Sequence, residues 1–381
     1  MGLDRFRRLS KLIGLGTTLV IVLQRAMVVA GSVPDTGQTT CYNHKEEIPC
    51  PEPGQAYSGQ DGSHVDVGWP SYTRLNQNGN PLHEGEAGNW IMTRDNVTHL
   101  VWEVKTDDGG IHDKDNTYSW CDTREATNGG DQGACGYGHD TEAFVAALNE
   151  ARFGGFTDWR LPTREELRSI VDYGADVPAI STAFFPNTST DYWTSSPFAG
   201  YRHSAWLVGG RGDGYDYKSS AFHARAVRSD DPAPASTGLV VNPEGTTVTD
   251  TRTGLVWQRN LARDECGRLQ TWTWGRALAY CEDPDLAGVG WRLPTVKELA
   301  SLVDLSRYGP AIDESVFPDT PSTFFWSSTT GAEDPNDAWV VGFQTGATSH
   351  DDKSNIYHVR CVRDSVSPAS GSRGGRAAAG R

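Results

Sequence analysis

The sequence predicts an α+β protein made of two tandem modules that share one fold, and two observations carry this prediction. The phrase WRLPT occurs at Trp159 and again at Trp291, 132 residues later. The 381 residues include 42 Gly, 20 Pro and 13 Trp. Gly and Pro interrupt regular elements and Trp anchors cores, so this composition favours short strands and many turns over a helical bundle.

Six blocks recur in the same order in the two halves of the chain. They are HLVWEV and GLVWQR, WRLPT and WRLPT, AISTAFFPNT and AIDESVFPDT, YWTSS and FWSSTT, AWLV and AWVV, and KSSAFHARAVR and KSNIYHVRCVR. Two long copies indicate a tandem duplication rather than a solenoid, whose repeats are shorter and more numerous. Copy one is about 23 residues longer between its first Trp and WRLPT. We interpret these extra residues as a structural loop, with a functional loop as the alternative.

The composition shifts along the chain predict its boundaries. We expect a signal peptide, a Gly/Asn/Pro-rich segment, the first module, a Pro- and Ser-containing linker, the second module and a disordered tail. In that order they occupy residues 1–30, 31–85, 86–228, 229–238, 239–365 and 366–381.

The N-terminus has the layout of a secretory signal peptide. Basic residues precede the apolar run Leu12–Leu23, and a small residue, Ala30, marks the expected cleavage site. A membrane anchor is the alternative, but a helix of about 12 residues reaches roughly 18 Å, short of a bilayer core of about 30 Å. The sequence therefore predicts an exported protein of the periplasm, cell surface or extracellular space, with no membrane span after cleavage.

The chain is acidic, with a formal net charge of −15 that becomes −19 when residues 1–30 are removed. Such a surface repels phosphate backbones and anionic head groups, which excludes nucleic acid and membrane surfaces as the main partner. The same charge argues against broad recognition of sulfated polysaccharides. It does not determine an oligomeric state.

Each WRLPT phrase leads into a helix start. Thr163 with Glu166, and Thr295 with Glu298, fit the capping box, in which a hydroxyl and a carboxylate satisfy free N–H groups at a helix N-terminus. Apolar residues then follow at helical spacing. We expect one main capped helix per module, with short strands around it and with the first and last strands able to pair. The repeated motif residues are structural: Trp159, Arg160, Pro162, Thr163, Glu166, Trp291, Arg292, Pro294, Thr295 and Glu298.

Seven Cys in an exported chain predict a disulfide framework with one free thiol. Copy one has neither Cys281 nor Cys361, and joint absence is what a bonded pair predicts. Cys41–Cys50 and Cys121–Cys135 are the expected local bridges, which leaves Cys266 unpaired. The alternative is that Cys266 takes one of these partners.

Common catalytic and metal signatures are absent from the sequence. There is no HExxH, CxxC, G-x-S-x-G or P-loop, so we predict no catalytic residue, no metal and no cofactor. An acidic loop is the alternative metal site, with oxygens from Asp107, Asp108, Asp113 and Asp115. Aromatic residues present in only one copy, Tyr201 and Tyr215, are the candidates for ligand contact, because the shared scaffold does not require them.

The chain resembles the Lcl C-terminal domain family, named for a bacterial collagen-like adhesin. The residues that carry the resemblance are GLVWQ, WRLPTVKEL, FWSST, AWVV and YHVRCVR, with their partners in copy one. The resemblance implies a C-type-lectin-like fold and an extracytoplasmic binding role, with glycan adhesion in a few members. We therefore expect a non-catalytic binding or adhesion protein of the bacterial envelope, with a glycan or a cell-surface protein as partner.

Two other functions remain open at this point. RLPT before an acidic capped helix is similar to the formylglycine-generating enzymes, so one alternative is a modifying or thiol-redox enzyme that uses Cys266 or Cys361. The enzymes of that family need a reactive cysteine pair, and copy one has no matching cysteine. The second alternative is a structural envelope component without a small ligand.

Overall fold

The structure is a computed structural model that describes residues 33–64, 68–83, 90–136, 138–175, 180–210, 212–229, 238–283, 286 and 289–365. The signal peptide expected over 1–30, nearly all of the linker expected over 229–238, and the tail expected over 366–381 lie outside the described residues. Within the described part, none of the helices combines the length and the apolar character needed to cross a membrane.

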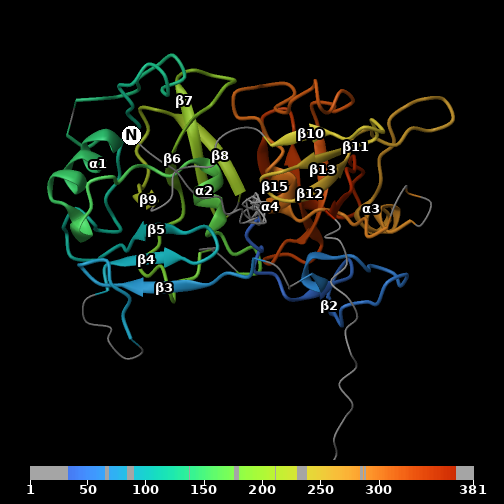
Figure 1. Cartoon of the computed structure of the whole chain (residues 1–381), viewed down its shortest axis with the longest axis horizontal. Helices are drawn as coiled ribbons and strands as arrows, with labels where there is room; N and C mark the ends of the chain where they lie inside the picture. Colours follow the sequence, from blue (N-terminus) through green and yellow to red (C-terminus); the bar gives the residue numbers. More distant parts are fainter. Residues whose placement is uncertain are drawn as a thin grey trace, which may run out of the picture.

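Module 1 comprises the described residues between 71 and 229, and it holds two antiparallel sheets (Figure 1). The first sheet has the strand order β3-β4-β5-β9, and the second has the order β6-β7-β8. The strands are β3 (Tyr72–Leu75), β4 (Met92–Asp95), β5 (Leu100–Glu103), β6 (Tyr192–Pro197), β7 (Ser204–Gly209), β8 (Gly212–Tyr217) and β9 (Val227–Ser229). The helices are α1 (Thr141–Glu150), α2 (Arg164–Ser169) and the short 3-10 turn η2 (Phe153–Gly155).

Module 2 comprises the described residues between 238 and 365, and it repeats this arrangement. Its sheets have the orders β10-β11-β12-β16 and β13-β14-β15. The strands are β10 (Leu239–Val241), β11 (Thr247–Asp250), β12 (Leu255–Gln258), β13 (Phe324–Thr330), β14 (Asp337–Gly342), β15 (Ala347–Asp352) and β16 (Val362–Asp364). The helices are α3 (Trp274–Cys281) and α4 (Val296–Ala300).

The strand that carries LVW pairs with the last strand in both modules. Trp102 of β5 lies opposite Val227 of β9, and Trp257 of β12 lies opposite Val362 of β16. The ends of each repeat therefore meet in one sheet, which closes each module as the sequence indicates. Both indole rings are fully buried between the sheet and the capped helix.

The expectation of one main helix per module is wrong. Among the described residues, each module has two α-helices. The helices with the capping box, α2 and α4, are the shorter ones, with 6 and 5 residues. Their partners α1 and α3 have 10 and 8 residues. Asp140 caps α1 by accepting from the Ala143 N–H, whereas no side chain of Thr273 caps α3. Both α1 and α3 lie between the first Trp block and WRLPT, in a stretch where the two copies share no sequence block.

The segment expected over 31–85 is not one unit, and the first module begins before residue 86. Tyr72–Leu75 forms β3 and pairs with β4 in register Tyr72–Asp95, as β10 pairs with β11. These two hairpins share no sequence block, because their strands are short and partly exposed. The part further upstream, residues 33–64, is not part of the module 1 sheets and contacts module 1 near Tyr173, whose N–H donates to the Thr36 carbonyl at 2.7 Å.

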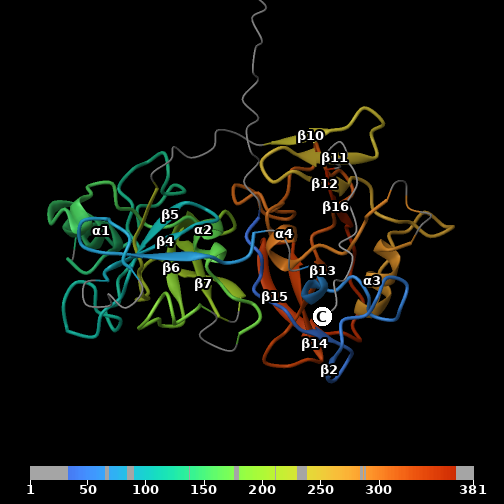
Figure 2. The ribbon, with the colours of Figure 1, turned by 60° about the horizontal axis from the view of Figure 1, so that its bottom comes forward.

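Residues 33–64, which we name the N-terminal strap, pack on module 2. In both views the blue strands of the strap, β1 (Cys41–Tyr42) and β2 (Glu47–Ile48), lie beside the orange module (Figures 1 and 2). The Gln38 side chain exchanges two hydrogen bonds with the backbone of Thr330. The Lys297 ammonium donates to the Asp35 carbonyl at 2.8 Å. The strap is therefore integral to module 2, although module 1, with about 160 residues, separates them in the sequence.

The strap occupies in module 2 the place that the longer loop of copy one occupies in module 1. Lys218 and Lys353 hold the same position in the repeat, and their ammonium groups lie 4.3 and 4.0 Å from the ring centroids of Trp120 and Trp274. Lys218 donates to two carbonyls of the Cys121–Cys135 loop. Lys353 donates instead to a carbonyl of the Cys41–Cys50 loop, that of Asn43. The extra residues of copy one thus have a structural counterpart that comes from the N-terminus.

Three disulfides join the pairs that the sequence predicts: Cys41–Cys50, Cys121–Cys135 and Cys281–Cys361. The long-range bridge ties α3 to the residue that precedes β16. Module 1 has Asn149 at the place of Cys281, and the Asn149 side chain makes two hydrogen bonds to the backbone of Trp159, at 2.8 and 2.9 Å. A polar clamp therefore holds the WRLPT strand of module 1 where module 2 has a covalent bond.

Candidate functional site

The repeated motif W-R-L-P-T-x-x-E orients the capped helix in each module. The Thr hydroxyl accepts from the backbone N–H of the Glu, and the Glu carboxylate accepts from the backbone N–H of the Thr, which completes both capping boxes. The same carboxylate is held by the Arg of the motif, with two contacts of 2.6 Å in Arg160–Glu166 and again in Arg292–Glu298. A bidentate pair fixes direction as well as distance. The motif therefore acts on the fold and not on a ligand.

A second repeated block supplies a further cap. The backbone N–H of Arg164, the first residue of α2, donates to the Ser196 hydroxyl of β6 at 3.2 Å. The backbone N–H of Val296 donates in the same way to the Thr329 hydroxyl of β13 at 3.0 Å. The YWTSS and FWSSTT strands thus satisfy an N–H that a helix start leaves without an intrahelical partner.

The tryptophans that recur in both copies are core residues. All eight have at most 8% of their surface exposed: Trp102, Trp159, Trp193, Trp206, Trp257, Trp291, Trp326 and Trp339. None of these rings presents a face to solvent that a ligand can stack on. The repeated tryptophans therefore belong to the scaffold. A binding site is expected on the surface that differs between the copies.

The two modules meet along β8 and β15, and we name this contact the seam. Asp213 of β8 lies between the guanidinium groups of Arg164 and Arg168, and all three side chains are buried. Burial alone raises the pKa of Asp213, but Arg168 and Arg164 outweigh it and hold the pKa below the ordinary value. Arg164 also donates to the Gly346 carbonyl of module 2. The seam is a buried contact in which one carboxylate lies between two guanidinium groups.

Aromatic residues cross the seam in both directions. Tyr173 of module 1 packs edge-on against Trp339 of module 2, with ring centroids 4.9 Å apart. Tyr308 of module 2 packs edge-on against Phe198 of module 1 at 5.9 Å. Each tyrosine comes from the loop that follows the capped helix, so the two crossings are related as the modules are.

Tyr201 and Tyr215, the candidates for ligand contact, lie together at this seam. Tyr215 stacks on Phe198 with centroids 3.8 Å apart and planes at 12°, and Tyr201 lies 5.8 Å from the same ring. We name Phe198, Tyr201, Tyr215 and Tyr308 the seam aromatic cluster. Tyr201 is 57% exposed, Tyr215 39% and Tyr308 44%, while Phe198 is buried beneath them. Sequence analysis missed Tyr308, because its neighbours come from the other module.

The family model of the Lcl C-terminal domain matches residues 91–228 and, a second time, residues 246–363. The chain belongs to the Lcl C-terminal domain family. This membership indicates a non-enzymatic domain of extracellular or adhesin-like type. No curated protein matches the chain.

The acidic loop of the first Lcl C-terminal module brings three of its four candidate metal ligands together. Oxygens of Asp107, Asp113 and Asp115 lie within 4.8 Å of one another, and Asp108 is not part of this group. Lys114 contacts Asp107 at 3.3 Å and Asp115 at 2.7 Å. The Asp113 carboxylate accepts from three backbone N–H groups, those of residues 108, 109 and 115. Lys114 and the backbone N–H donors are enough to hold these three carboxylates together, so the cluster is explained as part of a folded loop.

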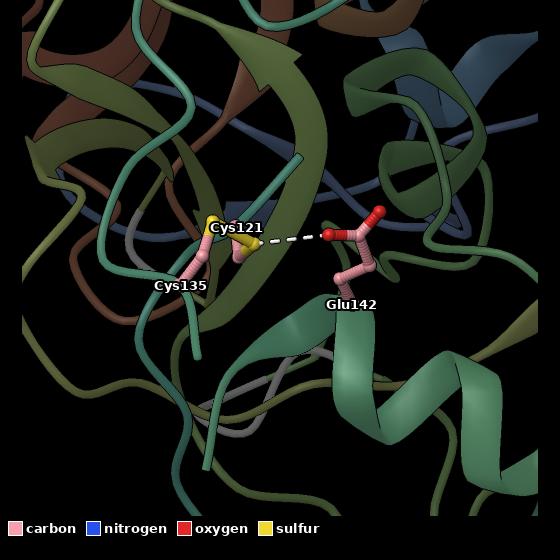
Figure 3. Close-up of side chains that lie close together, drawn as sticks. All are labelled: Cys121, Cys135 and Glu142. Atoms are coloured by element: carbon pink, nitrogen blue, oxygen red, sulfur yellow. Dashed lines mark hydrogen bonds between the residues drawn. A yellow bond between two sulfur atoms is a disulfide. The ribbon is translucent and has the colours of Figure 1, made fainter. Parts of the chain in front are cut away.

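Cys121, Cys135 and Glu142 form the other group with metal-ligand geometry, and Figure 3 shows why it does not act as one. The two sulfurs are bonded to each other, so neither is a thiolate. Glu142 points from the first turn of α1 toward Cys121, with Oε2 3.2 Å from the sulfur. This arrangement joins the loop to the helix start.

The cysteines leave little support for thiol chemistry. Cys361 is bonded to Cys281 and fully buried, so it is not an available nucleophile. Cys266 is the free cysteine of the described residues, and it is exposed in a turn held by the Asp264 carboxylate. The protein therefore lacks the pair of reactive cysteines that the chemistry of a formylglycine-generating enzyme needs.

A hollow in the described part lies between the N-terminal strap and α3. It has a volume of about 1070 Å³, and its walls include residues 53–58, Arg276, Glu282 and Trp291. Ser58 donates to Glu282 at one side of it. This groove lies where the strap packs on module 2, and Ser58 and Glu282 in its wall contact each other.

Proposed function

We propose that the chain is an exported, non-catalytic binding protein of the bacterial cell envelope that recognises a glycan through Tyr201 and Tyr215. The observation that carries the proposal is the exposure of these rings at the seam, in contrast to the burial of all eight repeated tryptophans. Exposed aromatic rings offer large, rigid surfaces with a polar hydroxyl, which suits a ligand with alternating C–H and O–H groups.

Export is supported by the cysteines and by the N-terminal pattern. Six of the seven cysteines form disulfides in the structure, and stable disulfides belong to oxidising compartments. The basic and apolar segment over 1–30 lies outside the described residues and keeps its interpretation as a signal peptide. We place the mature protein in the periplasm, at the cell surface or outside the cell.

A C-type-lectin-like fold for each module is part of the proposal. Its support is that the LVW strand of each module pairs with the last strand, which brings the ends of the module together. A second support is the pair of helices that packs with small antiparallel sheets in each module. Fold alone does not determine function, so the proposed ligand rests on the seam residues.

The test is a glycan array probed with the mature chain, residues 31–381, and with Tyr201→Ala and Tyr215→Ala. We expect the wild type to bind a restricted set of glycans, and each substitution to weaken that binding about tenfold or more, which corresponds to roughly 1.4 kcal/mol. Tyr217→Ala is the matched control, because Tyr217 lies on the same strand, is 67% exposed and stands outside the cluster.

Three results contradict this proposal or a part of it. If no glycan binds the wild type, the ligand is not a glycan, and a protein partner or a purely structural envelope role takes its place. If Tyr201→Ala and Tyr215→Ala both bind as the wild type does, the site lies elsewhere on the molecule. Turnover of a substrate that depends on Cys266 contradicts the non-catalytic part of the proposal.

A further inference from the structure

We propose that the ligand site is composite, with Tyr308 of module 2 beside Tyr201 and Tyr215 of module 1, and that it takes an uncharged sugar ring. This inference rests on the proposed function, since it specifies the site and the ligand class of the same binding activity. It goes further in that neither module alone holds the whole platform.

The position of Tyr308 against module 1 depends on a glycine. A Cβ added at Gly200 would lie 2.8 Å from ring atoms of both Tyr308 and Phe198, closer than side chains tolerate. The Tyr308 ring therefore occupies space that any other residue at position 200 would fill. Together with the edge-on contact to Phe198, this makes Tyr308 part of the module 1 surface.

The rings form a platform in which one layer supports the next. Trp206 is buried and meets both Phe198 and Tyr215 edge-on, at 5.2 and 5.8 Å. Phe198 supports Tyr215 from one side, so only the remaining surface of Tyr215 faces solvent. Burial raises the pKa of Tyr215, and the nearby Tyr201 and Tyr308 raise it further. Their hydroxyls give the platform a polar rim.

The seam holds the two halves of the platform in a fixed relation. A Cβ added at Gly212 would lie 2.5 Å from the Thr348 carbonyl oxygen, so the two edge strands approach backbone to backbone. The Asp213 N–H donates to the Thr348 hydroxyl at 3.0 Å, and the buried Arg164–Asp213–Arg168 group lies directly beside this contact. A preorganised platform avoids the entropy loss of ordering its rings when a ligand binds.

The charges around the platform favour an uncharged ligand. The chain has a net charge of −15, and the faces of aromatic rings are electron-rich, so both repel sulfate and carboxylate groups. Of the neighbouring cations, Arg307 is engaged by Asp304 at 2.9 Å, and Arg202 donates to His203 at 3.2 Å. The slightly positive C–H face of a pyranose is attracted to such rings, and its hydroxyls match the phenol rim.

A quaternary ammonium group also binds aromatic faces, but it is best held by a cage of rings. Tyr215 turns one face to Phe198 and lies at 39° to Tyr201, with their centroids 6.3 Å apart. This is a surface with neighbouring tilted rings rather than a box. The platform therefore favours a sugar over an ammonium ligand, and competition with choline tests this preference.

The experiment measures binding of four uncharged hexasaccharides, namely cellohexaose, laminarihexaose, chitohexaose and mannohexaose, to the mature full chain by isothermal titration calorimetry. We expect at least one of them to bind, and Tyr308→Ala and Gly200→Ala to weaken it about tenfold. Tyr217→Ala is expected to change the affinity less than about twofold. Circular dichroism and the unfolding midpoint establish that each variant is folded, and Tyr308→Phe, which keeps the ring, separates stacking from hydroxyl contacts.

The outcomes distinguish this inference from the proposed function. If Tyr215→Ala abolishes binding while Tyr308→Ala and Gly200→Ala bind as the wild type does, the site is not composite, although the glycan ligand stands. If only sulfated or carboxylated glycans bind on the array, the uncharged class is wrong. Displacement of the bound sugar from the wild type by choline also overturns the ligand class. If no glycan of any kind binds, both proposals fail.

Discussion

Asp61 of the N-terminal strap predicts how the stability of the protein depends on pH. The residue lies in the 3-10 turn η1 (Asp61–Ser63), fully buried against β13. The hydroxyls of Thr36 and Thr329 donate to Oδ2 at 2.8 and 2.5 Å, while Oδ1 has no hydrogen-bond partner among the described residues. We expect Asp61→Asn to remove a pH-dependent loss of stability between pH 4 and pH 7.

The expected magnitude follows from the pKa of Asp61. Burial raises it from 3.8 to about 7, against the two hydroxyl bonds that lower it, with small additional effects from Asp35 and Glu298. An acid whose pKa is higher in the folded state stabilises the fold fully below the unfolded pKa, and this contribution is lost as the pH rises through the folded pKa. Between pH 5 and pH 7, at about 1.36 kcal/mol per pH unit and less as the folded pKa is reached, the free energy of unfolding falls by roughly 2 kcal/mol through this group alone.

Urea unfolding at pH 5, 6, 7 and 8 measures this difference. The free energy of unfolding of Asp61→Asn minus that of the wild type is expected to rise by about 2 kcal/mol from pH 5 to pH 7, because other titrations cancel in the difference. The test is how this difference changes with pH, and not its constant part. The buried amide adds N–H groups whose burial costs about 1–3 kcal/mol at every pH. Asp115→Asn, on an exposed aspartate, is the control, with an expected change below about 0.5 kcal/mol.

A constant difference across the pH range would refute this reasoning. It would mean that Asp61 is ionised when folded at pH 5, and hence that its carboxylate is not enclosed between the strap and β13. The packing of the strap on module 2 would then need revision.

Three further predictions concern the covalent and ionic contacts. Replacing both Cys281 and Cys361 by Ser is expected to lower the free energy of unfolding by about 4 kcal/mol, because the bridge closes a loop with a sequence separation of 80; an unchanged urea midpoint would contradict this. Asp213→Asn leaves two buried guanidinium groups without their carboxylate, so we expect a loss of about 3–5 kcal/mol, and a loss below 1 kcal/mol in chemical denaturation would argue against a buried seam. Glu298→Gln is expected to cost more than Glu166→Gln, roughly 3 against 1 kcal/mol, because the Arg partner of Glu298 is 14% exposed and that of Glu166 is 40% exposed; equal shifts in thermal midpoint would contradict the difference.

Local rules were enough to predict the helix starts and the disulfides. A capping box is contained in four consecutive residues, so Thr163 and Glu166 reveal it without any knowledge of the fold. The Cys281–Cys361 pair is a long-range contact, but the comparison of the two copies exposed it, since both cysteines are missing from module 1.

Contacts between distant segments were not predictable in this way. The placement of the strap depends on single hydrogen bonds to backbone atoms, such as Lys353 to the Asn43 carbonyl, which leave no pattern in the sequence. The helix α1 was missed although Asp140 caps a run with helical spacing, because the stretch between HLVWEV and WRLPT shares no sequence block with copy two.

The candidate site was predicted only in part. Tyr201 and Tyr215 stood out because copy two has no counterpart for them, and the structure places both at the seam. Tyr308 offered no such signal, since only the packing of module 2 on module 1 brings it to Phe198. Residues at a contact between repeats are recognisable once the orientation of the repeats is known, and the sequence does not contain that orientation in any local form.

Hydrogen-exchange mass spectrometry of the mature chain with and without a bound glycan tests the central claim most directly. The claim is that the two Lcl C-terminal modules present one ligand platform at their seam. It predicts that ligand slows exchange in peptides that cover residues 198–217 of module 1 and residues 304–312 of module 2, and leaves the strap and α3 unchanged. Slower exchange in peptides of one module only, or around the groove between the strap and α3, would contradict it.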